Sequence, residues 1–209
     1  VGLSSSSATG DVSFTNLKNL VEANMSNGAG DVSVAYNAAI VAGTADTQTL
    51  NVANASAGTF TAAGVETVAI NTSLLASALT GITAGAMSKL TVAGDKDLSI
   101  ASALDFAGTG TINGTVDASA FTGGLTLNLS TAEVVSATGG SGADTFALNA
   151  TTTKADIIDG GDGSDTVAIT IGAETLDATA TTGELIGISN VETIRLVSSD
   201  TSDASTLNV

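Results

Sequence analysis

The chain has 209 residues, which is long enough for one or two domains with a buried core. It carries 21 acidic against 5 basic residues, a formal net charge of -16, and it contains no histidine, cysteine or proline. This composition excludes disulfide bonds, thiol catalysis and zinc sites built on histidine or cysteine, and the few scattered cations argue against binding to nucleic acid.

The apolar residues favour strands. Hydrophobic residues make up 43% of the chain but aromatic residues only 3%, so most apolar side chains are Ala, Val, Leu and Ile, interleaved with Thr, Ser and Gly. β-Branched residues suit the pleated surface of a sheet. No apolar run reaches the roughly 18 residues of a membrane span, so we expect none. The first residue is Val1 rather than Met, and we therefore expect a segment of a longer protein.

Two segments have apolar residues at helical spacing. Residues 14–25, "FTNLKNLVEANM", predict a short helix that caps the first turn of the fold. Residues 73–82, "SLLASALTGI", predict a second one, which Gly81 would end. In both segments the apolar stripe is interpreted as facing the core rather than as a functional surface.

Short alternating segments separated by Gly, Asp, Asn and Ser predict strands elsewhere. In chain order they cover residues 31–36, 49–52, 89–92, 97–100, 125–129 and 165–171. In addition, "GVETVAI" at 64–70 closely matches "NVETIRL" at 190–196. Recurrence of this kind predicts a coil of stacked repeats, in which one turn of the coil forms one rung.

Two nonapeptides have the pattern G-G-x-G-x-D-x-U-x, where U is a large apolar residue. They are "GGSGADTFA" at 139–147, with Phe146 as U, and "GGDGSDTVA" at 160–168, with Val167 as U. Glycine allows the backbone to bend through positive φ and turn its carbonyl groups inward, and the aspartate adds a carboxylate. Oxygen ligands of these two kinds favour a hard cation such as Ca²⁺.

The spacing adds a third, degraded copy. Asp156 precedes Asp165 by nine residues, and Ile158 precedes Val167 by nine, so "TTTKADIID" at 151–159 keeps the aspartate and the core residue but not the glycines. Stacked turns at about 5 Å per rung would line such carboxylates up along one edge, where they repel one another without a cation. The alternative is a set of surface turns with solvated acids, which we favour for the isolated Gly30–Asp31 turn.

The acidic residues concentrate after Gly139, and this suggests two regions. Residues 1–138 form a predicted Thr/Ala/Gly-rich β-repeat region with a short N-terminal helix. Residues 139–209 form a predicted calcium-binding β-roll region that continues the same solenoid.

The nonapeptide array resembles the signature of the RTX family, calcium-binding proteins exported by bacterial type I secretion. Together with "GVETVAINTS", "VDASAFTGGLTLNLS" and "GISNVETIRL", it resembles the repetitive region of RTX-type surface-layer (S-layer) proteins of Gram-negative bacteria, over roughly residues 64–197. The resemblance implies an all-β fold, a parallel β-solenoid or β-roll with calcium-binding turns, beside the one or two short helices predicted above. It also implies secretion to the cell surface, calcium-driven folding there, and assembly of copies into a two-dimensional lattice, with lipopolysaccharide as an anchor bound through a region outside this segment.

In that family, turn carbonyl groups and the motif aspartates of successive turns share each ion. Carried over to this chain, the resemblance implies Ca²⁺ ligands at Gly140, Gly142, Asp144, Asp156, Asp159, Gly161, Asp162, Gly163 and Asp165.

Two other functions compete with a surface layer. One is a calcium-dependent RTX adhesin or biofilm matrix protein, and the other is the non-catalytic calcium module of a secreted enzyme. Without histidine, neither a zinc protease motif nor a Ser-His-Asp triad can be built. Tyr36 is the only tyrosine and tryptophan is absent, so aromatic platforms for sugars are lacking. We therefore expect no enzymatic activity in this segment.

Overall fold

The computed structural model describes residues 2–6, 9–130, 133–149, 152–171, 175–177, 183, 185–198 and 206–208. The regular secondary structure of these residues consists entirely of β-strands, and all their strand pairs are parallel. The predicted all-β, parallel solenoid fold is confirmed. This part of the chain contains no helix with the length and apolar character needed to cross a membrane.

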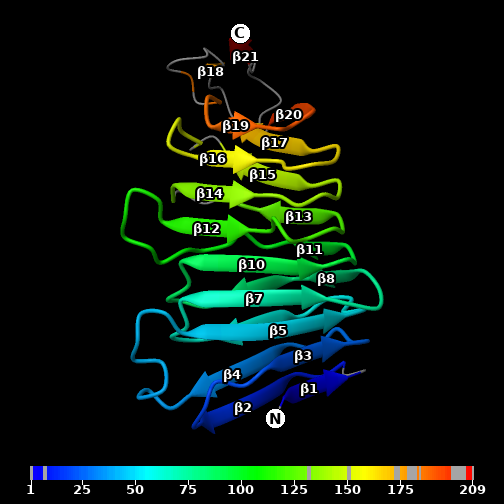
Figure 1. The fold of residues 1–209 in the computed structure, drawn as a ribbon, viewed down its shortest axis with the longest axis vertical. Helices are drawn as coiled ribbons and strands as arrows, with labels where there is room; N and C mark the ends of the chain where they lie inside the picture. The colour runs from blue at the N-terminus through cyan, green and yellow to red at the C-terminus, as the bar shows by residue number, and fades with distance from the viewer. Residues whose placement is uncertain are drawn as a thin grey trace.

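One side of the coil is a nine-stranded sheet that runs almost the whole length of the stack (Figure 1). Its strands, in spatial order, are β1 (Leu3–Ser6), β3 (Ala23–Ser26), β5 (Thr47–Ala53), β7 (Thr67–Thr72), β10 (Lys89–Gly94), β12 (Gly114–Asp117), β14 (Val135–Thr138), β16 (Ile157–Asp159) and β19 (Ile188–Ser189). Because each strand pairs with one that follows it after a full turn of the chain, the sheet grows by one strand per rung.

The other side consists of two shorter sheets. The four-stranded sheet contains β2 (Val12–Leu17), β4 (Val32–Tyr36), β6 (Thr59–Ala62) and β9 (Gly81–Thr83), and the six-stranded sheet contains β8 (Ser77–Leu79), β11 (Leu98–Ile100), β13 (Leu125–Asn128), β15 (Thr145–Asn149), β17 (Thr166–Ile171) and β20 (Thr193–Ser198). A separate pair joins β18 (Thr175–Asp177) to β21 (Thr206–Asn208).

The two shorter sheets meet at a step in the middle of the coil. The rung that begins with β7 contributes two short strands to this side, because β8 pairs with β11 of the next rung and β9 pairs with β6 of the preceding one. The strands on this side therefore shift along the rung at Thr80, which lies between β8 and β9.

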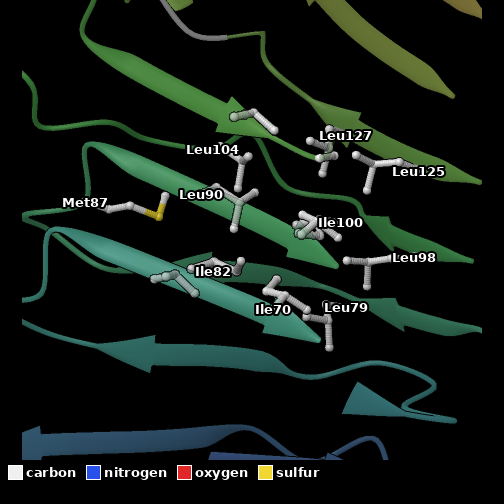
Figure 2. Close-up of a cluster of buried hydrophobic side chains, with 14 of the residues drawn as sticks. Ile70, Leu79, Ile82, Met87, Leu90, Leu98, Ile100, Leu104, Leu125 and Leu127 are labelled. Atoms are coloured by element: carbon white, nitrogen blue, oxygen red, sulfur yellow. The ribbon is translucent and has the colours of Figure 1, made fainter. Parts of the chain in front are cut away.

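The core lies between the two sides. Side chains alternate along each strand, so every second residue faces inward. Figure 2 shows Ile70 and Leu90 of the nine-stranded sheet together with Leu98, Ile100 and Leu125 of the six-stranded sheet, and all five are at most 1% exposed. Stacked aliphatic rows of this kind give each rung a hydrophobic contact with the next, as expected for a repeat coil.

The predicted helix over residues 14–25 is wrong, because this segment belongs to β2 and β3. Val12 and Phe14 of β2 alternate with exposed residues, and Ala23 and Met25 of β3 are buried with partly exposed residues after each. Apolar residues alternate along each of the two strands, and the turn between the strands places the two sets at a spacing that imitates a helix. Parallel pairing with neighbouring rungs decides the conformation.

The predicted helix over residues 73–82 is also wrong. The segment forms a turn followed by β8 and β9. Leu74 and Leu75 are 73% and 58% exposed, so they do not belong to an inward stripe. Ser77 and Leu79 are buried and the residue between them is exposed, which is the alternation of a strand.

The six predicted strands are confirmed as β4, parts of β5 and β10, β11, β13 and β17. The matching segments 64–70 and 190–196 lead into β7 and β20, which lie in different sheets. The similarity therefore reflects a shared turn-and-strand pattern rather than the same place in the rung.

The proposed boundary at residues 138/139 falls inside one continuous stack. Strand β14, which ends at Thr138, pairs with β12 before it and with β16 after it. The division into regions 1–138 and 139–209 stays a prediction from composition, and part of the second region lies outside the described residues.

Candidate metal site at the nonapeptide turns

The two nonapeptide turns lie directly above one another. Residues 139–144 connect β14 to β15, and residues 160–165 connect β16 to β17. Strand β14 pairs with β16, and β15 pairs with β17. Since the strands on both sides of each turn are neighbours, the turns occupy the same edge of the coil, one rung apart.

The glycines of these turns allow the backbones of successive rungs to touch. A Cβ atom at Gly142 would overlap the carbonyl oxygen of Gly123 in the rung before, and one at Gly161 would overlap the carbonyl oxygen of Gly140. Gly161 also has φ of 93°, a value that favours glycine. The glycine pattern is therefore required for close stacking, whether or not an ion is bound.

The motif aspartates occupy core positions. Leu127 pairs with Phe146, and Phe146 pairs with Val167, so Asp144 and Asp165 continue the inward row that Leu125 occupies in the preceding rung. Asp144 and Asp165 are each only 1% exposed. Removing a carboxylate from water is costly unless it gains partners, and these carboxylates are therefore not the solvated acids of an ordinary surface turn.

Backbone N–H groups compensate much of this cost. Asp144 Oδ1 accepts a hydrogen bond from the N–H of Leu125 at 2.8 Å, and its Oδ2 accepts one from Gly140 at 2.7 Å. Asp165 Oδ1 accepts from the N–H of Asp144 at 2.7 Å. Each aspartate thus holds the start of the strand in the preceding rung.

Glu192 extends this ladder by one step, and the sequence analysis did not identify it. Its Oε2 accepts a hydrogen bond from the N–H of Asp165 at 2.6 Å. The signal was present in the sequence, because Glu192 stands two residues before Ile194 as Asp165 stands two before Val167. It was obscured because Glu192 follows Asp165 by 27 residues rather than by 21, the separation of Asp144 from Asp165.

One carboxylate oxygen in this ladder has no partner. Asp165 Oδ2 is buried and makes no hydrogen bond in the part of the chain that the structure describes. Burial raises the pKa of Asp165 above its usual value, the N–H of Asp144 opposes this, and the charges of Glu192, Asp159 and Asp162 raise the pKa further. A buried oxygen surrounded by negative charge is a place where a cation would be stabilised.

Burial also raises the pKa of Asp144, although the N–H groups of Gly140 and Leu125 lower it and the charge of Asp165 adds to the rise. Both turns therefore hold a carboxyl group whose ionised form is disfavoured by its surroundings. Two neighbouring carboxyl groups with perturbed pKa values mark this place as a candidate functional site.

Asp156 lies on the opposite edge of the coil. It directly precedes β16, where the chain returns to the nine-stranded sheet. Its Oδ1 accepts from the N–H of Val135 at 2.9 Å, and its Oδ2 accepts from the N–H of Thr153 at 2.7 Å. The structure thus gives Asp156 the same capping role but does not bring it together with Asp144 and Asp165.

The length of a rung explains this separation. One rung takes 21 residues between Asp144 and Asp165 and contains two strands. A step of nine residues is about half a rung, so successive nonapeptides fall on alternating edges. The predicted single file of three aspartates is therefore replaced by a stacked pair and one residue across the coil.

Four other predicted residues meet at the outer surface of the stacked turns. Gly140, Asp159, Gly161 and Asp162 line an open concavity of about 330 Å³, together with Ser119, Thr138, Gly139 and Asn190. Asp159 Oδ1 accepts from Asn190 Nδ2 at 2.7 Å and from the N–H of Gly161 at 3.2 Å. The N–H of Asp162 donates to the Gly140 carbonyl at 2.9 Å.

The donor set fits a hard cation that accepts mixed oxygen ligands. Among the described residues, no group of three or more acidic side chains lies close enough to hold a metal by itself. An ion bound here would therefore need backbone carbonyl groups as further ligands, as in many Ca²⁺ sites, which take six to eight oxygens. Asp165 Oδ2 is the oxygen most clearly free to bind.

A turn outside the array behaves differently. Asp31 is exposed, and its Oδ1 accepts a hydrogen bond from the N–H of Thr59 at 2.7 Å. Asp31 therefore caps a neighbouring rung from the surface, which matches the alternative interpretation given to the Gly30–Asp31 turn.

No family model, curated protein or solved structure matches this chain.

Lowering the pH from neutral towards the ordinary aspartate pKa, about 4, is expected to stabilise the calcium-free protein through Asp144 and Asp165. Both pKa values are raised in the folded state, so the folded state binds protons more readily than the unfolded state, whose aspartates titrate near 4. The penalty for ionisation is fully present above the raised pKa and is relieved as the pH falls through it.

Urea denaturation in a chelator at several pH values measures this effect. A variant with both Asp144→Asn and Asp165→Asn should show a weaker gain on acidification, and the difference isolates these two groups from the rest of the acidic chain. An equal gain in both proteins would show that the buried pair is not its source.

Proposed function

We propose that this chain is a non-catalytic, structural segment of a bacterial surface layer, whose solenoid becomes fully stable when Ca²⁺ binds at the nonapeptide turns. The observation that carries the proposal is the buried, unpartnered Oδ2 of Asp165 within a ladder of acids. Such an arrangement is unfavourable in the absence of a cation.

Asp165 and Asp144 would hold the ion from the core side of the turns. The carbonyl groups of Gly140, Gly142, Gly161 and Gly163, with Asp159 and Asp162, are the further ligand candidates. Ca²⁺ would supply the positive charge that neutralises these carboxylates and links neighbouring rungs. Asp156, on the other edge, would contribute by holding Val135 in place.

This chemistry is consistent with folding after export. The net charge of -16 disfavours compaction of the metal-free chain. Extracellular calcium modules typically bind with dissociation constants of about 10⁻⁴–10⁻³ M, so the ion would bind outside the cell rather than in the cytoplasm. Binding energy then adds to folding energy.

The partners in this proposal are other copies of the protein, arranged in a two-dimensional lattice on the cell surface. Lipopolysaccharide, bound through a region outside this segment, would anchor the lattice. The regular parallel stack supports a structural role, because the nine-stranded sheet forms one side of the coil over almost its whole length (Figure 1).

Electron microscopy of the full-length protein tests this function. Ordered sheets should form in about 5 mM CaCl₂, well above the expected dissociation constant, and should be absent in chelator or in MgCl₂ at the same concentration. Isolated rods or monomers in all three conditions would contradict a lattice and would favour the adhesin instead.

A further inference from the structure

Leu74 occupies a strained position at which the preceding rungs have asparagine. Its φ is 63°, and the residues at the same place in the two rungs before, Asn27 and Asn54, have φ of 51° and 57°. Asparagine tolerates this left-handed conformation, whereas a bulky residue there is an outlier. Asn54 Nδ2 also donates to Asn27 Oδ1 at 2.9 Å, a contact that leucine cannot continue.

Burial does not explain the leucine. Leu74 is 73% exposed and the following Leu75 is 58% exposed, the two highest values among the exposed large hydrophobic residues of the described chain. A strained residue that serves neither the backbone nor the core indicates a function at the surface. Leu74 and Leu75 together form an exposed apolar projection, the leucine knob.

A groove of about 500 Å³ begins next to the leucine knob. It lies at the step between the two shorter sheets, where β8 is the last strand of the six-stranded sheet and the preceding rung contributes the loop residues 54–56. Short side chains line much of it, including Ala55, Ala76, Ala78 and Ala143. Because these side chains are short, they leave the space of the groove unfilled.

The leucine knob and the groove belong to one continuous surface. Residues 76–78, which line the groove, directly follow Leu75, and the N–H of the groove residue Asn54 donates to the Leu75 carbonyl at 3.4 Å. An apolar projection beside a hollow is the arrangement that a two-fold contact between identical copies requires. Around a two-fold axis, each copy inserts its projection into the hollow of the other.

The lining of the groove carries little charge. Two chains with a net charge of -16 each repel one another in general. Among the residues that line the groove, however, Asp97 is the one with a charged side chain. Its Oδ1 accepts from the N–H of Gly124 at 2.8 Å, and the adjacent Lys96 pairs with Asp95 at 2.7 Å.

We infer that the leucine knob and this groove form a two-fold contact between two copies of the chain. The contact specifies one interface of the assembly proposed above, and its biological role rests on that proposal. None of the candidate ligands lines the groove, so the contact itself contains no ion.

Sedimentation velocity over a range of protein concentrations tests the contact. We expect reversible dimers of the wild-type segment, and at least tenfold weaker association for Leu74→Asn. Ala78→Glu, which fills the groove and adds charge, should have the same effect. Ile157→Thr removes a 45% exposed residue on the outer side of the nine-stranded sheet and should leave association unchanged.

Two further measurements distinguish an apolar contact from an ionic one and from the effects of unfolding. Added NaCl should strengthen association, because it screens repulsion between acidic chains while leaving apolar contact intact. Leu74→Asn should not lower the melting temperature, because asparagine suits the left-handed turn, so weaker association cannot be attributed to unfolding.

The inference is overturned if the wild-type segment stays monomeric at high concentration, or if Leu74→Asn associates as the wild type does. Leucine-dependent binding to phospholipid vesicles without self-association would also overturn it, since the partner would then be a lipid. Calcium-dependent sheets of full-length Leu74→Asn protein would leave the proposed function intact while removing this contact from the lattice.

Discussion

Replacing Asp165 with asparagine is expected to stabilise the calcium-free protein and to abolish its stabilisation by calcium. Asparagine retains an Oδ1 that can accept from the N–H of Asp144 but removes the buried charge whose second oxygen has no partner. The loss of charge repulsion with Glu192, Asp159 and Asp162 should stabilise the protein by about 0.5–2 kcal/mol in chelator, although the amide Nδ2 then takes the place of the unpartnered oxygen.

The wild-type protein should instead gain stability from calcium. With a dissociation constant of about 10⁻⁴–10⁻³ M, a single site at about 10 mM Ca²⁺ contributes roughly 1.4–2.7 kcal/mol. Urea denaturation followed by circular dichroism, in chelator and in calcium, measures both values. In chelator the Asp165→Asn variant should therefore be the more stable of the two proteins. As calcium is added, the stability of the wild type should rise to that of the variant or above it.

Asp31→Asn is the matched control, because Asp31 caps a neighbouring rung from the exposed surface. It should leave the response to calcium at the wild-type value. If Asp165→Asn retains the full calcium response, the ion does not bind at this turn, and the proposed site is wrong.

Replacing Gly161 with alanine is expected to destabilise the protein by about 2–6 kcal/mol, with or without calcium. The added Cβ would overlap the Gly140 carbonyl oxygen, and φ of 93° is unfavourable for alanine. Overpacking typically costs about 1–3 kcal/mol, and a strained backbone adds about 1–3 kcal/mol.

Gly85→Ala provides the control for this substitution. A Cβ at Gly85 meets no atom within 4 Å, so the change in stability should stay within about 0.5 kcal/mol. Thermal melts of both variants, in chelator and in calcium, decide between two roles of the motif glycines. Loss of stability for Gly161→Ala in calcium only would mean that the glycine serves the ion rather than the stacking of rungs.

Together the two substitutions separate the functions of the nonapeptide. The glycines keep successive backbones in contact, and the aspartates hold the strand of the preceding rung and present a buried oxygen. A repeat coil without calcium needs the first property, whereas a calcium site needs both. The effect of Gly161→Ala should thus persist in chelator, while the effect of Asp165→Asn should change with calcium.

Local sequence determined the strands and the turns. The alternation of residues 31–36 and 125–129 was sufficient to predict β4 and β13, because period two leaves only one face for the core. The glycine and aspartate pattern of residues 139–144 and 160–165 predicted turns at those places for a similar reason, since few residues other than glycine allow such close backbone contact.

Local sequence misled where two strands followed one another closely. Residues 14–25 join parts of two strands across a turn, and residues 73–82 join a turn to two short strands; in both, the summed apolar spacing imitates a helix. The exposed Leu74 and Leu75 contributed most to the second error, because a leucine read from sequence is assumed to face the core.

The sequence by itself determined that this protein is a parallel β-coil with two Gly-Asp turns of one design. Only the tertiary structure decided which acids meet: Asp144 and Asp165 stack, Glu192 joins them, and Asp156 lies on the other edge. The physical reason is that the edge a residue reaches depends on the number of residues in a complete rung. That number is fixed by the lengths of all its turns and by pairing between rungs, which no short motif contains.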